Sequence, residues 1–447
     1  MQDLEVIVLA AGKSTRVKSE IPKVLHKIFG KPVLGYILDL LSAIKIKRIA
    51  LVVGYRQDLV KEFIKAYKNK LDIRLCRQKR LLGTADAIKP TRNLFKKAKA
   101  DVLILYGDHP LIKRQTLLDL TKTHRNNFAD CTLLTAMMDN PKDYGRIIRD
   151  RQGRVTKIVE EKDCLDQQKL IKEINTGIYC FKKDVLFSNI DKIKINKLKK
   201  EYYLTDIIEL LRNSGYKIEA VRLEDSSESY GINTREDLAK VIDIMRHRIL
   251  RDFMNEGVTI LDPNTTYIYP GVKIGQDTDI YPYTFIESGV VIGKRCSVGP
   301  FCHIRPKTIL ENDTSIGNFT ELNRSRIGSF TKVRHFSYLG DARIGEKVNI
   351  GAGTVTANYD GRNKNITKIG NGAFIGSDTI LVAPVEVGRK AITGAGCFVT
   401  RGKNVPDYSV VAGVPAKILK RTKKTHHRLK IVFKFEARIS KHETIFK

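Results

Sequence analysis

Residues 286–316 read IESGVVIGKRCSVGPFCHIRPKTILENDTSI, and this stretch decides the fold of the second half of the chain. An aliphatic residue stands at every sixth position, often followed by Gly, as in Ile292-Gly293. The repeat runs through Ile268, Ile274, Ile280, Ile286, Ile292, Val298, Ile304, Leu310, Ile316 and Leu322. A period of six is typical of a left-handed parallel β-helix, a hexapeptide-repeat solenoid. Each hexad would form one flat side of a triangular coil, with the aliphatic side chain inside.

The repeat is not perfectly regular. It slips by one position at Ile327 and at Ile344, and it is interrupted by the segment Thr356–Lys368 before it resumes at Ile369. An insertion in a solenoid leaves the stack as an external loop, and such loops commonly shape binding sites. We therefore predict a β-helix domain over residues 257–420 with a binding loop at the interruption.

Beyond the repeat, a basic C-terminal tail is predicted over residues 421–447. The segment Lys420–Lys447 carries ten Lys or Arg residues against two Glu, and the alternation in Leu429–Phe435 predicts one strand. A solvated tail explains this pattern without a dedicated partner.

The first half, residues 1–232, alternates two kinds of segment. The strand-like runs are Leu4–Leu9, Arg48–Val53, Asp101–Tyr106 and Cys131–Met138, and the helical patterns between them include Val33–Ala43, Asp58–Lys68 and Thr116–Arg125. This order predicts a mostly parallel, Rossmann-like α/β sheet with helices on both faces. Ligands of such sheets bind beyond the carboxyl ends of the strands. A helical pattern over residues 233–256, ended by Gly257, predicts a linker helix between the two domains.

Composition narrows the choice of partners. The chain has 447 residues, enough for two or three domains, and a formal net charge of +31. Such an excess favours nucleic acid, an anionic membrane or phosphorylated small molecules. No uncharged apolar run approaches the roughly 18 residues of a spanning helix, so no stable membrane insertion is expected. The acidic N-terminal segment Met1–Glu5 does not resemble a signal peptide. The chain has seven cysteines without CxxC spacing, which argues against a disulfide framework or a zinc site. We expect a cytoplasmic protein.

A glycine-containing loop directly follows the first predicted strand: Leu9-Ala10-Ala11-Gly12-Lys13-Ser14-Thr15-Arg16. Small residues let backbone N–H groups approach a phosphate, and Lys13 and Arg16 add positive charge. The loop matches neither GxGxxG nor GxxxxGK[ST], so neither the dinucleotide-binding nor the P-loop interpretation applies. Lys23, in Pro22-Lys23, places another cation near the same loop. These residues form a candidate phosphate site.

Further motifs follow in order: Leu82-Gly83-Thr84-Ala85 after Gln78, Tyr106-Gly107-Asp108, Tyr144-Gly145-Arg146, Val159-Glu160, Glu173–Gly177, Glu201–Asp206 and Gly231-Ile232-Asn233. With the glycine loop, this series resembles the sugar-nucleotidylyltransferase family. In that chemistry a sugar 1-phosphate attacks the α-phosphorus of a nucleoside triphosphate, so the protein positions phosphates and needs no covalent nucleophile.

The resemblance implies a role for each matching residue. Asp108 and Asn233 would hold Mg²⁺, which prefers few protein oxygens plus waters and phosphates. Gln78 and Gly83 would contact uracil. Thr84, Gly145, Glu160 and Asn175 would hold the sugar. The nucleotide and sugar-phosphate residues are thus Leu9, Ala10, Ala11, Gly12, Lys13, Arg16, Lys23, Gln78, Gly83, Thr84, Tyr106, Gly107, Asp108, Gly145, Glu160, Asn175 and Asn233.

A nucleotidylyltransferase half followed by a β-helix resembles the bifunctional N-acetylglucosamine-1-phosphate uridylyltransferase/glucosamine-1-phosphate acetyltransferase family over essentially residues 4–415. The most specific stretches are Arg334–Asp341, Val348–Gly353, Asn358–Gly361 and Ile375–Asp378. His is the side chain best suited to remove an amine proton near neutral pH, and the resemblance makes His335 that general base.

The resemblance also implies the remaining residues of the acetyl-transfer site. Arg305, Tyr338 and Asn349 would bind the sugar phosphate and ring. Asn358 and Tyr359 would close over the amino sugar, and Ala352, Ser377 and Ala395 would line the acetyl-CoA groove. A homotrimer formed through the β-helix, with sites between subunits, is a further implication.

Three positions depart from the family pattern. Asn323 stands where a sugar-phosphate Lys is usual, with Arg324 next to it. Gly413, in Ala412–Pro415, stands where some members have an Arg that contacts coenzyme A. Asp86 stands where His is frequent. None of these positions is His335, Asp108 or Asn233.

The leading hypothesis is therefore a bifunctional enzyme that makes UDP-N-acetylglucosamine, a cell wall and lipopolysaccharide precursor, from glucosamine 1-phosphate, acetyl-CoA and UTP. The alternative is a single-activity nucleotidylyltransferase, using UTP or dTTP, whose β-helix is a trimerisation or regulatory module. No nucleic-acid motif accompanies the basic charge, so nucleic acid is not expected as a partner. The sequence leaves open dTTP against UTP, and galactosamine against glucosamine.

Overall fold

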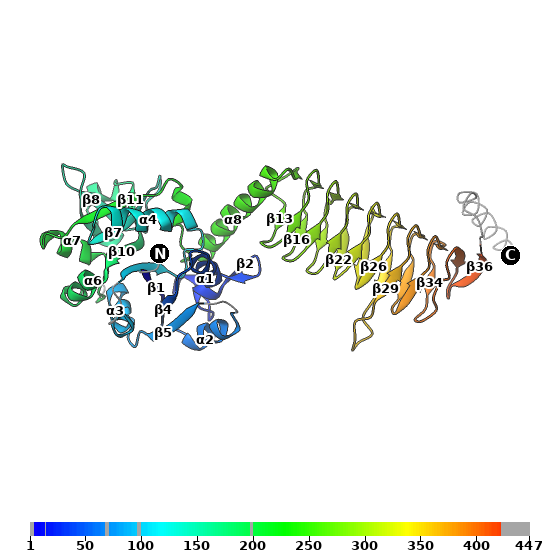
Figure 1. Cartoon of the computed structure of the whole chain (residues 1–447), viewed down its shortest axis with the longest axis horizontal. Coiled ribbons are helices and arrows are strands. Elements are labelled where there is room, and N and C mark those ends of the chain that lie inside the picture. Colours follow the sequence, from blue (N-terminus) through cyan, green and yellow to red (C-terminus); the bar gives the residue numbers. More distant parts are fainter. Residues whose placement is uncertain (1–3, 14, 68–70, 96–99, 197–199, 422–447) are drawn as a thin grey trace. The chain divides into compact units, whose positions relative to one another are not determined.

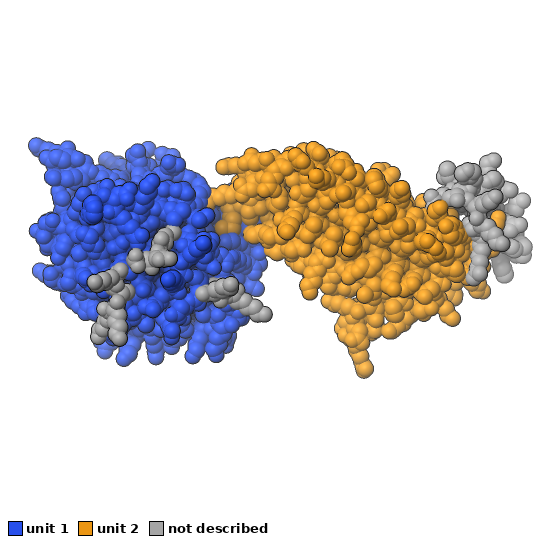
Figure 2. Space-filling model, in the orientation of Figure 1, with its two compact units in different colours: residues 1–244 blue, residues 245–447 orange. Residues whose placement is uncertain are grey.

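The computed structural model describes residues 4–13, 15–67, 71–95, 100–196 and 200–421 (Figure 1). The chain divides into two compact units, residues 1–244 and 245–447 (Figure 2). The division falls within α8 (Arg235–Asn255), which is followed by Gly257 at a φ of +88°. The strand predicted within 429–435 lies outside the described residues. Among the helices of the described ranges, none has the length and apolar character needed to cross a bilayer.

The first unit is built on a nine-stranded sheet. Its main path runs in the order β11 (Ile218–Arg222), β7 (Cys131–Met137), β10 (Glu173–Lys182), β6 (Asp101–Tyr106), β1 (Leu4–Ala10), β4 (Arg48–Val53) and β5 (Asp72–Arg77), with β8 (Arg146–Arg149) and β9 (Val155–Val159) attached beside β10. Strands β6, β1, β4 and β5 are parallel, as predicted. Strand β10 runs antiparallel to both neighbours, and it is absent from the runs predicted as strands.

Helices cover both faces of this sheet because successive apolar side chains of its strands point to opposite faces. In β1, Val6 and Val8 pack on one face, with the helices α1 (Val33–Ala43), α2 (Gln57–Ala66) and α4 (Arg114–Asn126). Ile7 and Leu9 pack on the other, with α3 (Thr84–Ile88), α6 (Lys183–Asn189) and α7 (Asp206–Asn213). Two short elements, the hairpin β2 (Lys27–Ile28) with β3 (Lys31–Pro32) and helix α5 (Asp166–Lys169), complete the unit. The doubly covered sheet confirms the predicted Rossmann-like class.

The second unit is the predicted left-handed parallel β-helix, whose coils stack regularly along Figure 1. One face holds β12 (Thr259–Ile260), β15 (Asp279–Ile280), β18 (Ser297–Val298), β21 (Ser315–Ile316), β24 (Lys332–Val333), β27 (Asn349–Ile350), β30 (Phe374–Ile375), β33 (Ile392–Thr393), β35 (Ser409–Ala412) and the antiparallel β36 (Lys417–Arg421). The second holds β13 (Tyr267–Ile268), β16 (Phe285–Ile286), β19 (His303–Ile304), β22 (Thr320–Asn323), β25 (Ser337–Gly340), β28 (Val355–Ala357), β31 (Ile380–Val382) and β34 (Phe398–Val399). The third holds β14 (Lys273–Ile274), β17 (Val291–Ile292), β20 (Ile309–Leu310), β23 (Arg326–Ile327), β26 (Ala342–Ile344), β29 (Thr367–Ile369) and β32 (Val385–Val387).

The aliphatic residue of each hexad forms the interior of these coils. Along the first face, Ile280, Val298, Ile316, Val333 and Ile350 pair in register, and each is at most 2% exposed. The two slips of the repeat therefore shorten a coil by one residue without moving the aliphatic side chain out of the core. The interruption leaves the stack between β28 and β29, so that residues 358–366 form the external loop.

Stacked coils approach each other most closely at the glycines that follow the interior residue. A Cβ on Gly317 would overlap the carbonyl oxygen of Arg334 in the next coil. Because that oxygen belongs to the backbone directly after β24, which cannot simply move aside as a flexible side chain could, we expect Gly317→Ala to destabilise the β-helix by about 3 kcal/mol. Gly289→Ala is the control, since its Cβ would meet open space and adds only the strain of a φ of +79°. Melting temperatures that fall equally in both variants would contradict a steric origin.

Candidate active sites

The first candidate site lies where the parallel strands of the first unit end. The glycine loop begins after Ala10, at the end of β1, Gln78 follows β5, and Asp108 follows β6 by two residues. Strands β6, β1, β4 and β5 are parallel neighbours, so their carboxyl ends meet at one edge of the sheet. This explains why the glycine loop, Gln78 and Asp108, which lie far apart in the sequence, contribute to one site.

A pocket of about 1390 Å³ opens at this edge. It is lined by the predicted residues Leu9, Ala10, Ala11, Gly12, Lys13, Arg16, Lys23, Gln78, Gly83, Thr84, Tyr106, Asp108, Gly145, Glu160, Asn175 and Asn233. Gly107 is the predicted residue outside this lining. Its N–H donates to the carbonyl of Leu9 at 2.9 Å, and a Cβ there would press on Leu34 and Val24. Gly107 therefore acts behind the pocket wall, where it lets Asp108 approach β1.

Lys23, Asp108 and Asn233 form a connected group within the pocket. The Lys23 ammonium contacts Oδ2 of Asp108 and donates to Oδ1 of Asn233 at 2.9 Å. Asp108 is 3% exposed. Burial alone would raise the pKa of Asp108, but Lys23 and then His109 outweigh it and hold the pKa well below its ordinary value. The carboxylate is thus kept ionised at neutral pH.

The same group fits a divalent cation. Two oxygens, one from Asp108 and one from Asn233, already converge on a single positive charge, the Lys23 Nζ. The second carboxylate oxygen, Oδ1, is buried and lies 3.1 Å from Nδ1 of His109. Hard oxygen donors in small number suit Mg²⁺, which completes its shell with water and phosphate.

Further acidic, polar and aromatic groups line the pocket, among them Glu160, Thr205, Tyr106 and His109. Glu160 accepts a hydrogen bond from the Thr205 hydroxyl at 2.8 Å. Gly177, at a φ of +78°, lies against the ring of Tyr106, where no side chain would fit. His109 also packs on Tyr106, edge to face, with ring centroids 5.5 Å apart. Thr205 and His109 were not among the predicted site residues, although both lie within or beside motifs that the resemblance identified.

Asp206, next to Thr205, has an unusual environment. Burial and then the nearby Glu160 raise the pKa of Asp206 from 3.8 to about 6. An acid whose pKa is higher in the folded state destabilises the fold as the pH rises from about 4 to 6. We therefore expect Asp206→Asn to stabilise the protein at pH 8 by on the order of 1 kcal/mol, after solvent screening, and to change little at pH 4.

The matched control for this prediction is Asp184→Asn, in the first turn of α6, whose side chain is 93% exposed. Thermal unfolding at both pH values is the measurement. A gain in melting temperature at pH 4 that equals the gain at pH 8 would contradict the assignment of the effect to ionisation.

The second candidate site lies on the second face of the β-helix. Arg305 follows β19, and its guanidinium contacts Glu321 of β22 at 2.9 Å and Glu287 at 3.8 Å. Tyr338 of β25 is the direct ladder partner of Glu321. Arg305 and Tyr338 therefore project from nearby coils of the same face, beside the exposed His335 that precedes β25.

The root of the external loop lies next to Tyr338. A Cβ on Gly340 would come within 2.6 Å of the Tyr338 hydroxyl and 2.7 Å of the Asn358 amide nitrogen. These two polar groups therefore gather over Gly340. Asn358 is 6% exposed, whereas Tyr359, the next residue, is 61% exposed. The loop thus begins with one anchored residue and one that faces solvent.

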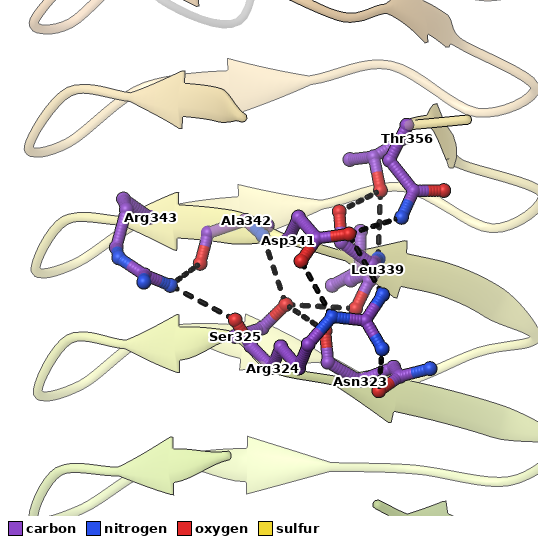
Figure 3. Close-up of polar contacts among 10 residues, drawn as sticks. Asn323, Arg324, Ser325, Leu339, Asp341, Ala342, Arg343 and Thr356 are labelled. Atoms are coloured by element: carbon purple, nitrogen blue, oxygen red, sulfur yellow. Dashed lines mark hydrogen bonds and ion pairs between the residues drawn. The ribbon is translucent and has the colours of Figure 1, made fainter. Parts of the chain in front are cut away.

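Arg324 anchors this same region instead of offering a free cation. Its guanidinium forms a two-pronged contact with Asp341, Nε to Oδ1 at 2.6 Å and Nη2 to Oδ2 at 2.8 Å, while Nη1 donates to Asn323 at 2.8 Å (Figure 3). Asp341 also accepts from the Asn358 amide. Each guanidinium nitrogen of Arg324 makes one such contact, so a sugar-phosphate role for Arg324, next to Asn323, would require it to share its five N–H groups with Asp341.

The predicted acetyl-CoA residues lie one above another. The Ala352 carbonyl accepts from Asp378 N, and the Ser377 carbonyl accepts from Gly396 N, so Ala352, Ser377 and Ala395 follow the same face on successive coils. Asn349 lies on β27, which ends two residues before Ala352.

Comparison with known proteins covers both units. The family model of nucleotidyl transferases matches residues 5–238. The model of bacterial transferase hexapeptide repeats matches residues 289–324, and the model of hexapeptide repeats of succinyl-transferase matches residues 366–401. The first model therefore spans the sheet with its pocket, and the other two lie in the β-helix.

Relatives align along both units. The bifunctional protein GlmU of Pelotomaculum thermopropionicum is 44% identical, covering 86% of this chain and 90% of the relative. The protein of the same name from Fervidobacterium nodosum is 41% identical, covering 96% of this chain and 99% of the relative. The one from Thermosipho melanesiensis is 42% identical, covering 91% and 94%.

Proposed function

The chain belongs to the family of bifunctional GlmU proteins, and on that premise we propose that it makes UDP-N-acetylglucosamine in two reactions. It is a nucleotidyltransferase and an acetyltransferase. The first reaction acetylates glucosamine 1-phosphate with acetyl-CoA, and the second transfers uridylyl from UTP to N-acetylglucosamine 1-phosphate with release of pyrophosphate. The single-activity alternative is not favoured, because the relatives named bifunctional match both units.

The observation that carries the proposal is the convergence of the glycine loop, Lys23, Asp108 and Asn233 in one pocket. In uridylyl transfer, a phosphate oxygen of the sugar phosphate attacks the α-phosphorus in line, a new P–O bond forms, and the bond to pyrophosphate breaks. Lys13, Arg16 and Lys23 would neutralise and align the phosphates. Asp108 and Asn233 would hold Mg²⁺, which supplies further charge neutralisation when bound. Glu160, Asn175 and Thr84 would orient the sugar.

Acetyl transfer is proposed for the β-helix. The sugar amine attacks the thioester carbonyl of acetyl-CoA, the C–N bond forms, and the C–S bond breaks to release the coenzyme A thiol. His335 would accept the amine proton. Arg305, Tyr338 and Asn349 would bind the sugar phosphate and ring, and Asn358 and Tyr359 would close over the amino sugar. The row formed by Ala352, Ser377 and Ala395 would line the acetyl-CoA groove.

Two properties accompany this proposal. The β-helix would form a homotrimer with the second site between subunits, a state that the hexapeptide repeats suggest. A cytoplasmic location follows from the proposed substrates, UTP and acetyl-CoA, which are cytoplasmic metabolites.

A two-arm assay on the full chain tests the function. One arm supplies glucosamine 1-phosphate or galactosamine 1-phosphate with acetyl-CoA and measures the released thiol. The other supplies the acetylated sugar phosphates with UTP or dTTP and Mg²⁺ and measures pyrophosphate. Turnover is expected in both arms, with the glucosamine substrates and UTP preferred. Turnover in the second arm alone would support the single-activity alternative.

A further inference from the structure

Gln78, at the end of β5, has both protons of its side-chain amide committed to the protein. Nε2 donates to the carbonyl of Gly83 at 3.0 Å and to Oδ2 of Asp86 at 2.9 Å. Gln78 is 6% exposed and lines the nucleotide pocket. An NH₂ group has two protons, so these two contacts use its full donor capacity.

The orientation of this amide follows from the chemistry of its neighbours. A backbone carbonyl and a carboxylate can only accept hydrogen bonds, so both require the NH₂ end of Gln78. If the amide were rotated by 180°, its carbonyl oxygen would face two acceptors, one of them with a formal negative charge. Gly83 alone would favour the observed orientation weakly, whereas the carboxylate of Asp86 favours it strongly, since hydrogen bonds to charged groups are the stronger ones.

We propose that Asp86 is a positioning residue that makes the nucleotide site select bases carrying an imino N–H over bases carrying an acceptor at that place. With both amide protons engaged, Gln78 offers the base only its carbonyl oxygen. Uracil and thymine present N3–H and can donate to it, whereas cytosine presents an unprotonated N3 and is repelled. Asp86 does not line the pocket, so it acts on the base through Gln78. This inference rests on the proposed nucleotidylyl transfer.

The test compares UTP, dTTP and CTP as substrates for pyrophosphate release with Asp86→Ala. The ratio of kcat/KM for UTP to that for CTP is expected to fall by about tenfold, mainly through KM, because the amide is freed to rotate. The ratio of UTP to dTTP should stay within about twofold, since both bases present N3–H. Asp86→Asn should restore most of the discrimination, because an amide carbonyl can still accept from Nε2.

A double-mutant cycle separates positioning from a general structural effect. In a Gln78→Ala background, Asp86→Ala should leave the UTP to CTP ratio unchanged, because no amide remains to be oriented. An equal fall of the ratio in both backgrounds, or a ratio within twofold of the parent in Asp86→Ala, would overturn the proposal. Absence of turnover with every nucleotide in the unmutated protein would instead refute the proposed function, and acetyl transfer reports independently on the folded β-helix.

Discussion

Asp108→Asn is expected to reduce uridylyl transfer by about a hundredfold or more and to leave acetyl transfer unchanged. The substitution keeps the size of the side chain but removes a negative charge that the protein maintains despite burial, through Lys23 and His109. Without this charge, the side chains at positions 108 and 233 that would hold Mg²⁺ are both neutral amides. Lys23 would also be left beside a neutral amide, so the phosphates would meet a differently placed ammonium.

Pyrophosphate release, measured at saturating UTP over a range of Mg²⁺ concentrations, checks this expectation. The matched control is Asp101→Asn, at the other end of the same strand, where the carboxylate pairs with Arg125 at 3.2 Å. The control should lower stability slightly and leave both activities within about threefold. Retention by Asp108→Asn of a tenth or more of the parent activity would remove Asp108 from the proposed metal site.

The β-helix was largely predictable because one periodic requirement governs it. Each hexad must place an aliphatic residue in the interior, so the sequence marks the strands directly, and even the one-residue slips at Ile327 and Ile344 appear in the ladder as coils that remain in register. The sheet of the first unit was less predictable. Strand β10 lies between β6 and β7 and runs antiparallel to both. No local pattern within residues 173–182 indicates which strands will be its neighbours.

The same contrast holds for the candidate sites. Residues at strand ends, such as Gly12, Gln78 and Asp108, could be predicted to meet because parallel strands bring their ends together. Pairings across the pocket, such as that of Thr205 with Glu160, join residues 45 positions apart and depend on how loops pack. Packing of this kind leaves no periodic signal in the sequence.

The contact between Arg324 and Asp341 was not predicted, although the length of the repeat indicates it. Arg324 and Asp341 are 17 residues apart, the length of one shortened coil, and they meet between neighbouring coils (Figure 3). Asp341 and Asn358 have the same separation and also meet. Counting coil lengths would have predicted that Arg324 meets the carboxylate of Asp341. The spacing of a solenoid thus identifies contacts between coils as well as the interior.

His335→Ala is expected to lower acetyl transfer by about a hundredfold to ten-thousandfold and to leave uridylyl transfer unchanged, in the range typical of a lost general base. The imidazole is exposed and makes no hydrogen bond or ion pair within the part of the chain that the structure describes, so its removal should cost little stability. Its backbone carbonyl, which accepts from the Thr320 hydroxyl at 3.2 Å, stays in place in the variant. The loss should therefore appear in kcat, with small changes in the KM values for the two substrates.

Thiol release from acetyl-CoA with glucosamine 1-phosphate is the measurement, and His247→Ala is the control. This variant removes another histidine of the same unit, on α8, whose Nε2 lies 3.3 Å from Oδ1 of Asn264. The control should retain acetyl transfer within about twofold. An acetyl-transfer rate in His335→Ala equal to that of the control would exclude the imidazole as the base. The amine proton would then have to leave to water or to another group near Tyr338.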